Sequence, residues 1–554
     1  MTFLAKRAGR RIVKTILLPL ALFTGTSLSA FTISGTIKDV VSGTNLSSVE
    51  VVVISQTPAT RDTITSNYKG EWTFTSDYTG IEDFSSVPTQ FSVAQNFPNP
   101  FNPSTTIEFS VRNAGMTEVT VHNLLGQEVD SRRQYLSPGF YHITWKNQGS
   151  AGMYFYTIRN HDQTITRKMI QLDGGQQGGL SPILGSAAPQ RIALQRPTSL
   201  PLTIIFSKFA YVSDTLNLDI VGGETFETFL ETIHNQAILV DLHNDILEIM
   251  LDDTGYHFMP KHDYHDTDIP RLILGGVDIQ FFAVWISPNA YPVNQFQKAQ
   301  EAIGLFNREM NLYPDYIRQA RSADEALAIA HEGKIAAVLA VEGGHVIEND
   351  ISKLISFYDA GMRYLTLTWN NSTDWAVSAS DSRSSTVGLS DFGKRVIRTL
   401  DSLGVIIDVS HVGIKTIEDV LEITGNPIIA THSGVRAIQN SSRNLYDKQI
   451  QAIAASGGVI GIVFYPPFLK SGRTATVEDL VKHIDYIVNL VGIDYVAIGS
   501  DYDGIGSNKV NGMKDVSQFP NLTFALLQHG YSKSDVRKIL GGNFLRVFRQ
   551  VCTD

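Results

Sequence analysis

The sequence predicts a multidomain protein in which a TIM-type (β/α)8 barrel follows two all-β sandwich regions. From residue 233 onward, apolar runs of strand length alternate with helical stretches, which is typical of a parallel sheet covered on both faces. Between residues 31 and 74, short segments instead alternate polar and apolar residues between turn signals. Strands that repeat with intervening helices indicate a barrel, and strands joined by turns indicate a sandwich.

Length and composition narrow the class of protein. The chain has 554 residues, which indicates several domains rather than one core. Its formal net charge of -10 argues against a nucleic-acid-binding protein, because such proteins carry basic patches. Cys552 is the only cysteine, so neither an intrachain disulfide nor a cysteine-based metal cluster can form. Any bound metal must be held by His, Asp and Glu side chains.

The first thirty residues have the pattern of a targeting segment. Basic residues from Lys6 to Lys14 precede an apolar run at 15–23, and small residues follow at 27–30. This order predicts a cleaved secretory signal, and the apolar run is too short to span a bilayer. The pair Arg10-Arg11 also resembles a twin-arginine export signal. Since no later stretch has the length of a membrane helix, we expect a soluble, exported protein with no transmembrane segment.

The segment before the barrel resembles two known β-sandwich types. Strands expected at 33–37 and 49–53, together with the stretch 205–216, resemble a carboxypeptidase-regulatory-like sandwich. Between them, the motif QNFPNPFNPSTTI at 95–107, followed by 123–129 and 151–156, resembles the immunoglobulin-like type A tails of type IX secretion. This order implies a second sandwich inserted into the first. Its internal position favours a spacer or packing role over a sorting signal.

These segments define the expected domain organisation. It comprises a signal peptide at 1–30, the first part of the outer sandwich at 31–82, an inserted domain at 83–174, a loose linker rich in Gly, Ser, Gln and Pro at 175–201, the last part of the outer sandwich at 202–223 and the barrel at 232–554.

Eight strands and their helices can be placed in the barrel region. The apolar runs lie at 238–240, 277–286, 336–341, 364–368, 405–409, 428–430, 459–464 and 495–498. Helical patterns between them lie at 296–310, 322–331, 351–360, 391–403, 415–423 and 477–491. In a (β/α)8 barrel, functional groups gather at the carboxyl ends of the strands.

Residue types that bind metals follow several of these strands. They are His243 and Asp245 after the first strand, Glu342 after the third, His411 after the fifth, His432 after the sixth, and Asp501 and Asp503 after the eighth. One such residue could arise by chance, but a set of them at these places predicts a metal site.

The expected chemistry is hydrolysis at a pair of divalent ions. A carboxylate has two oxygens, so Glu342 could bridge two Zn²⁺ ions that lie about 3.5–4 Å apart and lower the pKa of a shared water from about 15.7 toward about 7. The resulting hydroxide attacks a carbonyl without a serine or cysteine nucleophile. Asp501 could act as general base and then protonate the leaving amine. The alternative for Asp501 is a structural carboxylate that caps a loop.

The barrel region also resembles the membrane (renal) dipeptidase family of the amidohydrolase-like barrels, peptidase family M19. The resemblance is specific and covers well over half of the chain. The motifs that carry it lie at 241–245, 341–345, 361–368, 388–411, 430–433, 442–444, 499–504 and 542–548.

The resemblance implies a role for each matched residue. His243 and Asp245 would bind one zinc ion, His411 and His432 would bind the other, and Glu342 would bridge them. It also implies that Arg443 binds the terminal carboxylate of the substrate, for which a guanidinium fork is well shaped. A salt-bridged surface arginine is the alternative for Arg443. Asp501 would meet the free amine of the substrate and manage the proton.

One departure from the family concerns the loop after the fourth strand. Mammalian members carry a histidine there that contacts the reacting carbonyl, whereas this chain has Trp369 followed by Asn370. Tryptophan offers an N–H donor but cannot become a cation. Asn370 could then stabilise the oxyanion. Trp369 either contacts the substrate or lines the pocket as a core residue.

The sequence therefore predicts an exported zinc dipeptidase that acts through a metal-bridging hydroxide on dipeptides. The resemblance to the family implies that D-residues at the carboxyl side are tolerated. One alternative is a binuclear amidohydrolase acting on other amides or lactones. Another is a non-catalytic surface or adhesion protein with a degenerate barrel. No lipid anchor is implied, and the final compartment (periplasm, cell surface or medium) stays open. A homodimer and a contact of the sandwiches with the cell envelope also stay open.

Overall fold

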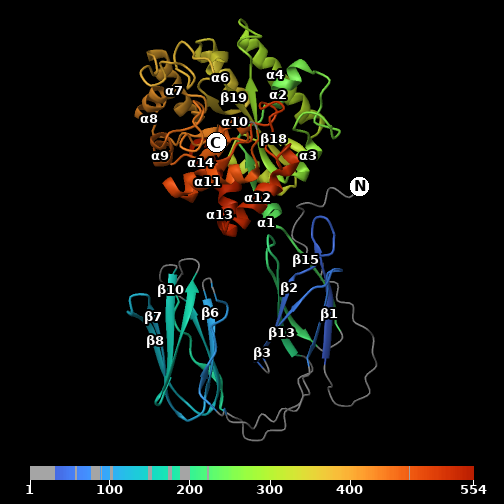
Figure 1. The fold of residues 1–554 in the computed structure, drawn as a ribbon, viewed down its shortest axis with the longest axis vertical. Coiled ribbons are helices and arrows are strands. Elements are labelled where there is room, and N and C mark those ends of the chain that lie inside the picture. Colours follow the sequence, from blue (N-terminus) through green and yellow to red (C-terminus); the bar gives the residue numbers. More distant parts are fainter. Residues whose placement is uncertain are drawn as a thin grey trace.

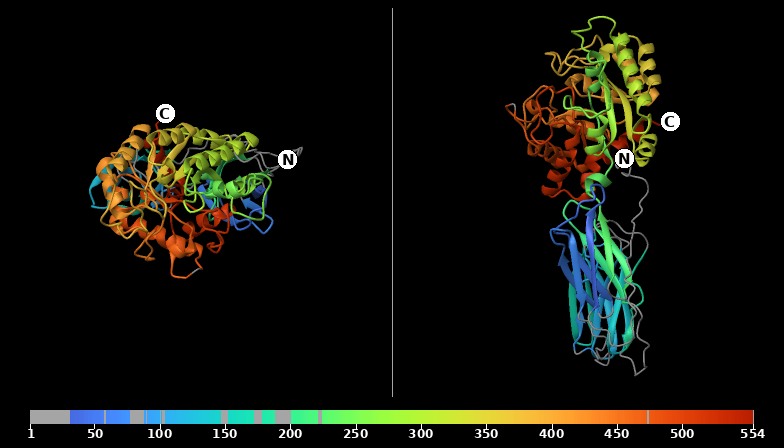
Figure 2. Two further views of the ribbon diagram at one scale, coloured as in Figure 1. Left: turned by 90° about the horizontal axis from the view of Figure 1, so that it is seen from above. Right: turned by 90° about the vertical axis from the view of Figure 1, so that its right-hand side faces the viewer.

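The computed structural model describes residues 31–56, 59–76, 88, 90–99, 101, 104–146, 152–171, 178–187, 200–220, 224–472 and 474–553. The expected signal peptide at 1–30 lies outside the described residues. The barrel occupies one end of the molecule and the β-sandwiches occupy the other, as Figures 1 and 2 show. Among the described helices, none combines the length and the apolar character needed to cross a membrane.

Eight parallel strands form the barrel, as predicted. They are β16 (Leu239–Asp241), β17 (Val277–Trp285), β19 (Ile335–Glu342), β20 (Met362–Thr366), β21 (Ile406–Asp408), β22 (Ala430–Ser433), β23 (Ile460–Ile462) and β24 (Val496–Ile498). The first five pair in the order β16-β17-β19-β20-β21, and the last three pair as β22-β23-β24. A bridge between Asp408 and Ile429 joins the two sheets on one side. On the other side, the amide of Leu242 donates to the Ile498 carbonyl oxygen at 3.0 Å, which closes the ring.

The strands are nearly continuous apolar runs because both faces of the sheet are covered. Every residue of β17 and of β19 is buried. A short extra strand, β18 (Ile317–Gln319), pairs with the start of β19 and was not predicted.

Helices between the strands agree with the predicted segments. They are α4 (Gln295–Leu312), α5 (Ala323–His331), α6 (Ile351–Ala360), α7 (Asp391–Leu403), α8 (Ile414–Ile423) and α11 (Val477–Val491). Local chemistry fixes their ends. The side chains of Ser322, Asp350 and Ser390 each accept a hydrogen bond from a backbone amide in the first turn of α5, α6 and α7. Gly361 and Gly404 adopt the left-handed conformation that ends α6 and α7.

The final helix, α14 (Asn543–Val551), seals the amino-terminal end of the barrel. Its Phe544 and Phe548 contact Phe281 inside the barrel, with ring centroids 5.1 and 5.6 Å apart. Residues near the starts of the strands, such as Ala336 and Ile406, belong to the same apolar cluster. The opposite end, where the strands finish, is left for polar side chains.

The first sandwich combines strands from both sides of an interruption in the chain. One sheet has the order β15-β1-β4, and the other has the order β14-β13-β2-β3. Their bounds are β1 (Phe31–Asp39), β2 (Glu50–Gln56), β3 (Ala59–Thr65), β4 (Glu71–Ser76), β13 (Leu200–Ser207), β14 (Asp214–Ile220) and β15 (Thr225–Leu230). The strands predicted at 33–37 and 49–53 are present as β1 and β2. The sandwich extends beyond residue 223, because β15 pairs in parallel with β1.

A second sandwich lies between β4 and β13 in the chain. Its sheets have the orders β11-β10-β7-β8 and β12-β9-β6-β5. The bounds are β5 (Ser92–Val93), β6 (Ser104–Val111), β7 (Gly115–Asn123), β8 (Glu128–Leu136), β9 (Gly139–Lys146), β10 (Gly152–Asn160), β11 (Gln163–Gln171) and β12 (Leu184–Ala187). Trp145 lies at the centre of the core, with its ring centroid 5.7 Å from that of Phe101 and 5.1 Å from that of Tyr154.

The loose linker predicted at 175–201 is wrong for residues 178–187 and for its last two residues. Leu184–Ala187 form strand β12, which pairs antiparallel with β9. Leu180 and Ile183 are buried in the core of the second sandwich. The Gly- and Ser-rich composition of this segment indicates a linker. The segment forms a strand because β12 pairs with the edge of β9, which is distant in the sequence. Residues 200 and 201 begin β13.

The first sandwich touches the barrel at a small junction. The rings of Phe209 and Phe524 meet edge to face, with centroids 5.5 Å apart. Tyr211 and Thr232 form an antiparallel bridge, and the Lys533 ammonium donates to the Tyr211 carbonyl oxygen at 2.8 Å. Phe209 lies in the loop between β13 and β14, and Phe524 lies on α12 (Phe519–Gln528). The contact therefore joins a sandwich loop to a helix on the outside of the barrel.

Candidate metal centre

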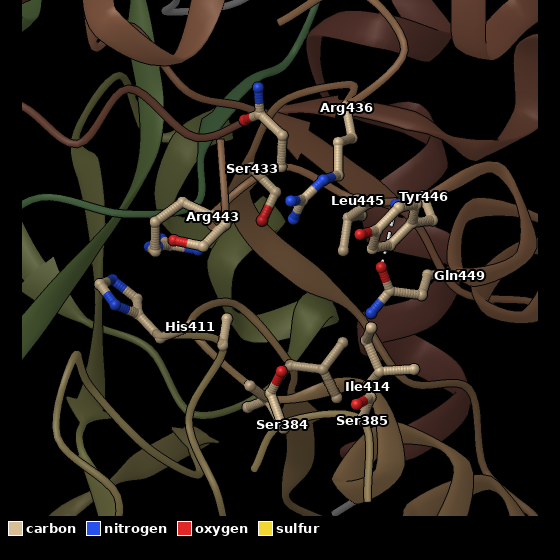
Figure 3. A pocket seen from close by; sticks show the side chains of 15 residues that line it. Ser384, Ser385, His411, Ile414, Ser433, Arg436, Arg443, Leu445, Tyr446 and Gln449 are labelled. Atoms are coloured by element: carbon tan, nitrogen blue, oxygen red, sulfur yellow. Dashed lines mark hydrogen bonds between the residues drawn. The ribbon is translucent and has the colours of Figure 1, made fainter. Parts of the chain in front are cut away.

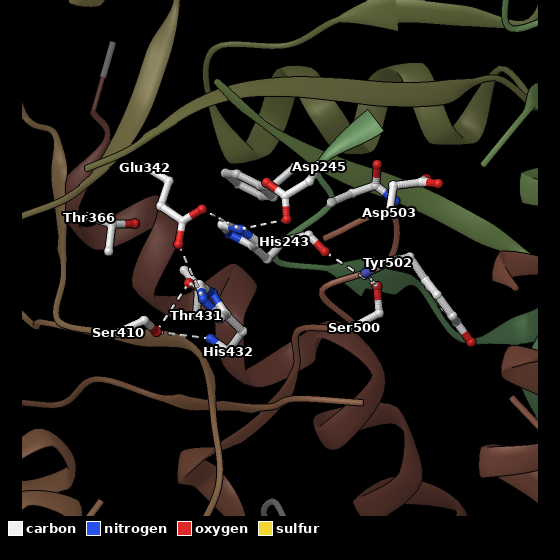
Figure 4. A network of polar contacts seen from close by, with 12 residues as sticks. His243, Asp245, Glu342, Thr366, Ser410, Thr431, His432, Ser500, Tyr502 and Asp503 are labelled. Carbon is white, nitrogen blue, oxygen red and sulfur yellow. Dashed lines mark hydrogen bonds and ion pairs between the residues drawn. The ribbon is translucent and has the colours of Figure 1, made fainter. Parts of the chain in front are cut away.

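Side chains from the ends of five barrel strands converge at one place. His243 and Asp245 follow β16, Glu342 ends β19, His411 follows β21, His432 lies in β22, and Asp501 follows β24. All are buried except Asp501, which is partly buried. Figure 4 shows the carboxylate of Glu342 beside His243 and His432, with one oxygen directed at each.

Glu342 occupies the middle of the cluster. Its Oε2 lies 3.4 Å from His243 Nε2. Its Oε1 lies 2.9 Å from His411 Nε2 and 3.4 Å from His432 Nε2. Each carboxylate oxygen thus faces a different set of imidazoles, which is the arrangement required of a bridging carboxylate.

Hydrogen bonds fix the tautomer of His243. The Tyr364 hydroxyl donates to the Leu242 carbonyl oxygen at 2.9 Å, so its oxygen accepts from His243 Nδ1–H at 2.7 Å. The proton of the neutral ring is therefore on Nδ1, and the lone pair of Nε2 faces Glu342.

His432 is oriented by a similar chain. The Thr431 hydroxyl donates to Asp408 Oδ2 at 2.7 Å and accepts from His432 Nδ1–H at 2.8 Å. Asp408, the buried last residue of β21, also accepts from the hydroxyl of Thr366 at 2.5 Å and from the amide of Ser410 at 3.0 Å. A carboxylate that lies behind a histidine in this way fixes the orientation of the ring for metal binding.

His411 also carries its ring proton on Nδ1, although the residue that accepts this proton is less buried. Its Nδ1–H donates to Asn370 Oδ1 at 3.1 Å. The Nε2 atoms of His411 and His432 lie 3.0 Å apart. With both Nδ1 atoms protonated, two lone pairs point toward each other, and a cation between them would remove their repulsion. His411 also adopts a φ of 67°, a conformation that costs energy for a residue with a side chain.

The donor set fits a metal ion. Among the described residues, His243 Nε2 and Asp245 Oδ1 are buried without a hydrogen-bond partner. Buried polar atoms of this kind normally have a partner, so both atoms require one that the protein chain does not supply. Ligand atoms of His243, Glu342 and His432 lie within 4.8 Å of one another, as do those of His243, Asp245 and Asp501. Imidazole and carboxylate donors in two overlapping groups suit divalent ions such as Zn²⁺.

Asp501 lies against Asp245 on the β24 side of the cluster. The amide of Asp501 donates to the His243 carbonyl oxygen at 3.1 Å, and its backbone has a φ of 63°. A Cβ atom at Gly504 would collide with Asp245 Oδ2 and Asp501 Oδ1, so the close approach of this loop requires glycine. Burial, and then the Asp245 carboxylate, raise the pKa of Asp501 well above its usual value.

The electrostatics of the site follow from burial and mutual contact. Burial lowers the pKa of His411 to about 4, with a further contribution from Arg443. Burial also lowers the pKa of His432 well below its usual value. Burial alone would raise the pKa of Glu342, but His243 and His411 outweigh it and hold that pKa well below the usual value. Burial would lower the pKa of His243, but Tyr364, Asp245 and Glu342 outweigh it and raise that pKa well above its usual value. Neutral imidazoles at His411 and His432 beside an ionised carboxylate are the protonation states that a metal needs, whereas at His243 a metal would take the place of a proton.

Arg443 is buried beside the cluster. It lies 6% exposed, and its Nη2 donates to the His432 carbonyl oxygen at 3.2 Å. Its Nε is buried without a partner among the described residues. The ring of Phe468 lies 5.6 Å from the guanidinium carbon. Burial lowers the pKa of Arg443 to about 10, which still leaves it a cation at neutral pH. No ion pair holds this arginine among the described residues, so it can receive an anionic ligand.

The two residues predicted for the loop after β20 have different surroundings. Trp369 is half-buried, with its ring centroid 4.8 Å from that of Trp285 and 6.3 Å from that of His411. Asn370 is exposed and orients His411. Asp503 does not join the cluster. Its Oδ1 accepts from the amide of Asp266 at 2.8 Å, so it anchors the loop that follows β24.

Several supporting residues were not predicted from the sequence. Tyr364, Asp408 and Thr431 orient the histidines as described above. Asp241 accepts from the Ser500 hydroxyl at 2.7 Å, and burial raises its pKa to about 6 although the Ser500 hydrogen bonds lower it. A signal was present, because Asp241 and Asp408 each end an apolar run just before a cluster histidine.

Comparisons with known proteins agree with this geometry. Residues 227–553 match the family described as membrane dipeptidase (peptidase family M19), and residues 95–171 match the secretion system C-terminal sorting domain. Dipeptidase 3 of Mus musculus is 33% identical over 324 residues, which is 56% of this chain and 64% of the relative. Dipeptidase 3 of Rattus norvegicus is 33% identical over 322 residues, or 56% of this chain and 65% of the relative. The chain thus spans less than two thirds of these relatives.

Solved structures show the same relationship for the barrel. The crystal structure of the M19 metallopeptidase dipeptidase AC has a TM-score of 0.54 and 26% identity, covering 57% of this chain and 99% of that chain. A metallopeptidase from Rhodobacter sphaeroides, liganded with a phosphinate mimic of the dipeptide L-Ala-D-Ala, has a TM-score of 0.53 and 25% identity over 57% of this chain and 99% of its own. The probable dipeptidase PvdM from Pseudomonas aeruginosa has a TM-score of 0.53 and 27% identity over 58% and 96%.

The family match covers more than half of the chain and spans all the strands that supply the cluster. The protein therefore belongs to the membrane dipeptidase family, peptidase family M19.

Proposed function

We propose that this protein is a metal-dependent dipeptidase with two zinc ions in the barrel. The observation that carries the proposal is the position of Glu342, whose Oε2 faces His243 and whose Oε1 faces His411 and His432. Family membership supports the reaction class, since M19 relatives are named as dipeptidases.

The ligand sets follow from which atoms face each other. His243 and Asp245 would hold one ion, with 3.5 Å between His243 Nε2 and Asp245 Oδ2. His411 and His432 would hold the other ion, and Glu342 would serve both. When bound, such ions polarise the scissile carbonyl and lower the pKa of a water at the site.

The chain's own residues then bind the substrate and move the proton. Asp501 lies beside Asp245 and is the carboxyl group placed to hold a proton and to receive the free amine of the dipeptide. Arg443 would bind the terminal carboxylate in bidentate fashion. Trp369 with Trp285 would form an aromatic wall that excludes water from the reacting bond. Asn370 would orient His411 by accepting a hydrogen bond from its Nδ1–H. We also propose that Asn370 contacts the oxyanion of the substrate.

Acceptance of D-residues at the carboxyl side is part of the proposal. Support comes from the Rhodobacter sphaeroides relative, which was solved with a mimic of L-Ala-D-Ala. Export is also proposed, and it is supported by the match of residues 95–171 to a secretion sorting domain. We further propose the division into an outer sandwich, an inserted sandwich and a barrel, since β5 to β12 pair with one another while β13 pairs with β2 and β15 pairs with β1.

A panel of dipeptides tests the function directly. The full chain would be assayed on L-Ala-L-Ala, L-Ala-D-Ala, a lactone and an N-acyl amide, each with and without a chelator and after zinc is restored. We expect dipeptide turnover that the chelator abolishes and zinc restores, with about two zinc ions per chain by elemental analysis. Turnover of the lactone or acyl amide alone would favour the other amidohydrolase. Well under one zinc per chain, with no turnover after zinc addition, would favour a non-catalytic barrel.

A further inference from the structure

A pocket of about 210 Å³ adjoins the metal centre. His411 and Arg443 belong to both the pocket and the cluster described above. The pocket continues away from the cluster along Ser433 and Arg436 toward Tyr446. Its volume is below the roughly 300–1,000 Å³ of sites that enclose a drug-sized ligand, so it suits one part of a small substrate. Figure 3 shows its lining side chains.

The charge of this pocket is opposite to that of the whole chain. Arg436 and Arg443 both line it, and none of the described residues that line it is an aspartate or glutamate. The chain carries a formal net charge of -10. A cationic pocket in an acidic protein attracts an anionic group to this place in particular.

Arg436 is held in position but is not neutralised. Its guanidinium carbon lies 4.4 Å from the centroid of the Tyr446 ring. Its Nε donates to Asn440 Oδ1 at 3.0 Å, and its backbone amide donates to the Leu445 carbonyl oxygen at 2.9 Å. Among the described residues, its two terminal nitrogens have no hydrogen-bond or ion-pair partner. Stacking fixes the plane of a guanidinium and leaves its outer edge free for a carboxylate.

A second polar group supports the same reading of the pocket. Ser433, the last residue of β22, has a fully buried hydroxyl without a partner among the described residues. In Figure 3 this hydroxyl and the Arg436 guanidinium are directed toward the same space. A buried hydroxyl that lacks a partner requires a ligand atom or a water.

We propose that this pocket receives the side chain of the substrate's C-terminal residue, and that Arg436 makes the enzyme prefer a carboxylate there. This inference rests on the proposed dipeptidase function. Once Arg443 binds the terminal α-carboxylate, the side chain of the same residue is the part of the dipeptide closest to the pocket that Arg443 shares. A glutamate or aspartate side chain would meet Arg436 at the pocket's far part and could also accept from the Ser433 hydroxyl. Arg436 is thus a specificity residue and has no part in bond cleavage.

The substrate pair L-Ala-L-Glu and L-Ala-L-Gln tests this preference, because the two differ in charge at nearly equal size. The same comparison is made with the D-forms of the second residue. We expect the zinc-supplemented full chain to favour glutamate over glutamine by about tenfold in kcat/KM, mostly through KM, as is typical of a charge-assisted contact. Raising the salt concentration should reduce this ratio, because Arg436 is only half-buried.

Three variants separate the role of Arg436 from general damage. Arg436→Met should bring the glutamate-to-glutamine ratio to about one, with a larger loss of kcat/KM for L-Ala-L-Glu than for L-Ala-L-Gln. Arg436→Lys should retain part of the ratio. The matched control, Lys448→Met, removes an exposed cation from the neighbouring helix α9 (Asp447–Ala455) and should leave the ratio unchanged. A wild-type ratio near one, or an equal loss for both substrates in Arg436→Met and Arg436→Lys, would overturn the proposal.

Binding of the free amino acids gives a readout that needs no turnover. Calorimetry with L-glutamate, D-glutamate and L-glutamine should show tighter binding of at least one glutamate enantiomer to the wild type, and this advantage should vanish in Arg436→Met. If no dipeptide is hydrolysed but this binding difference is found, the proposed function fails and the pocket assignment stands. If dipeptides are hydrolysed but neither glutamate binds better than glutamine, the pocket assignment fails and the function stands.

Discussion

The barrel and the second sandwich both bury apolar cores, but their buried polar side chains differ in how they are satisfied. In the sandwich, buried polar groups satisfy one another. For example, Asn96 Nδ2 donates to Thr105 Oγ1 at 2.9 Å, and the Tyr156 hydroxyl donates to the Ala94 carbonyl oxygen at 2.7 Å. In the barrel, His243 and Asp245 keep buried atoms that no described residue satisfies. Among the described residues, the groups able to hold a metal ion are all in the barrel.

Strand direction explains the difference. Parallel strands finish at the same end of a barrel, so one side chain from each of five strands can meet at a point. Antiparallel strands finish alternately at opposite ends of a sandwich, which disperses their terminal residues. The amino-terminal end of the barrel is filled by Phe544 and Phe548 of α14, so convergence is confined to the other end.

Buried charge separates the two regions in energetic terms. Burying ionisable groups costs several kcal/mol for each ion unless partners offset the loss of solvent. The barrel nevertheless buries Glu342, three histidines and Arg443 within one region. Stability alone gives no reason for this set, whereas bound cations would offset the cost and use the same atoms. The predictions below test whether the chemistry and the metal belong to the barrel alone.

The largest effect is expected for Glu342→Gln. The amide removes the charge that both imidazole sets face and replaces one oxygen by a donor, which cannot bind a cation. We expect dipeptide kcat/KM to fall on the order of a thousandfold or more, together with loss of bound zinc. Steady-state kinetics and elemental analysis on the same preparation would check both.

The matched control for this change lies in the sandwich. Glu118 pairs with Arg133 at 2.6 Å on the sandwich surface, so Glu118→Gln removes a carboxylate from an ion pair without touching the barrel. Activity should stay within about twofold of the wild type, because surface ion pairs contribute little. Full activity and full zinc content in Glu342→Gln would contradict the proposed centre.

A smaller effect is expected for Asp408→Asn. Asp408 accepts four hydrogen bonds, two on each oxygen. An amide group would present donors to the hydroxyl of Thr431 and release His432 from its fixed orientation. We expect zinc affinity to fall about 10–100-fold, as is usual when a partner behind a metal ligand is lost. Competition with a chromogenic chelator would measure the change.

A sandwich carboxylate with comparable contacts provides the comparison. Asp130 Oδ2 accepts from the Trp145 indole at 3.2 Å and from the amide of Leu180 at 2.7 Å. Asp130→Asn should lower the unfolding temperature of the sandwich and leave zinc affinity unchanged. Equal loss of zinc affinity in both variants would mean that the two regions are coupled.

Much of the barrel could be predicted from the sequence because its strands and helices are determined by residues close together in the chain. Each buried parallel strand is a continuous apolar run, and each helix is marked by capping residues such as Ser322 and Ser390. The metal-binding residue types were visible because they follow those runs directly. The fold rule then placed them together without any knowledge of distances.

The remaining features depend on partners distant in the chain. Strand β12 is defined by the edge of β9, and β15 by its parallel pairing with β1, about 190 positions earlier. Tyr364 lies inside a buried strand, so its sequence context indicates a core aromatic residue. Only the structure shows that its hydroxyl contacts His243. The sequence around Arg436 indicates an ordinary loop cation, and only the structure shows that Arg436 lines a pocket. Sequence patterns therefore locate candidate metal-binding residues at strand ends more readily than the residues that orient them.

The smallest effect is expected at the junction between the regions. In Phe209→Ala the edge-to-face contact with Phe524 is lost, and both rings are already partly exposed. An aromatic pair of this kind contributes about 0.5–1.5 kcal/mol, and here that energy holds the sandwich against α12 and contributes nothing to the metal centre. We expect faster proteolysis between β15 and α1 (Ile233–Gln236), with zinc content and dipeptide kcat/KM unchanged.

A fall in kcat/KM at full zinc content would show instead that the sandwich supports the active conformation of the barrel. The bridge between Tyr211 and Thr232, the Lys533 contact and the packing of Val212 against the barrel core would then be the routes to examine, because Phe209→Ala leaves them in place.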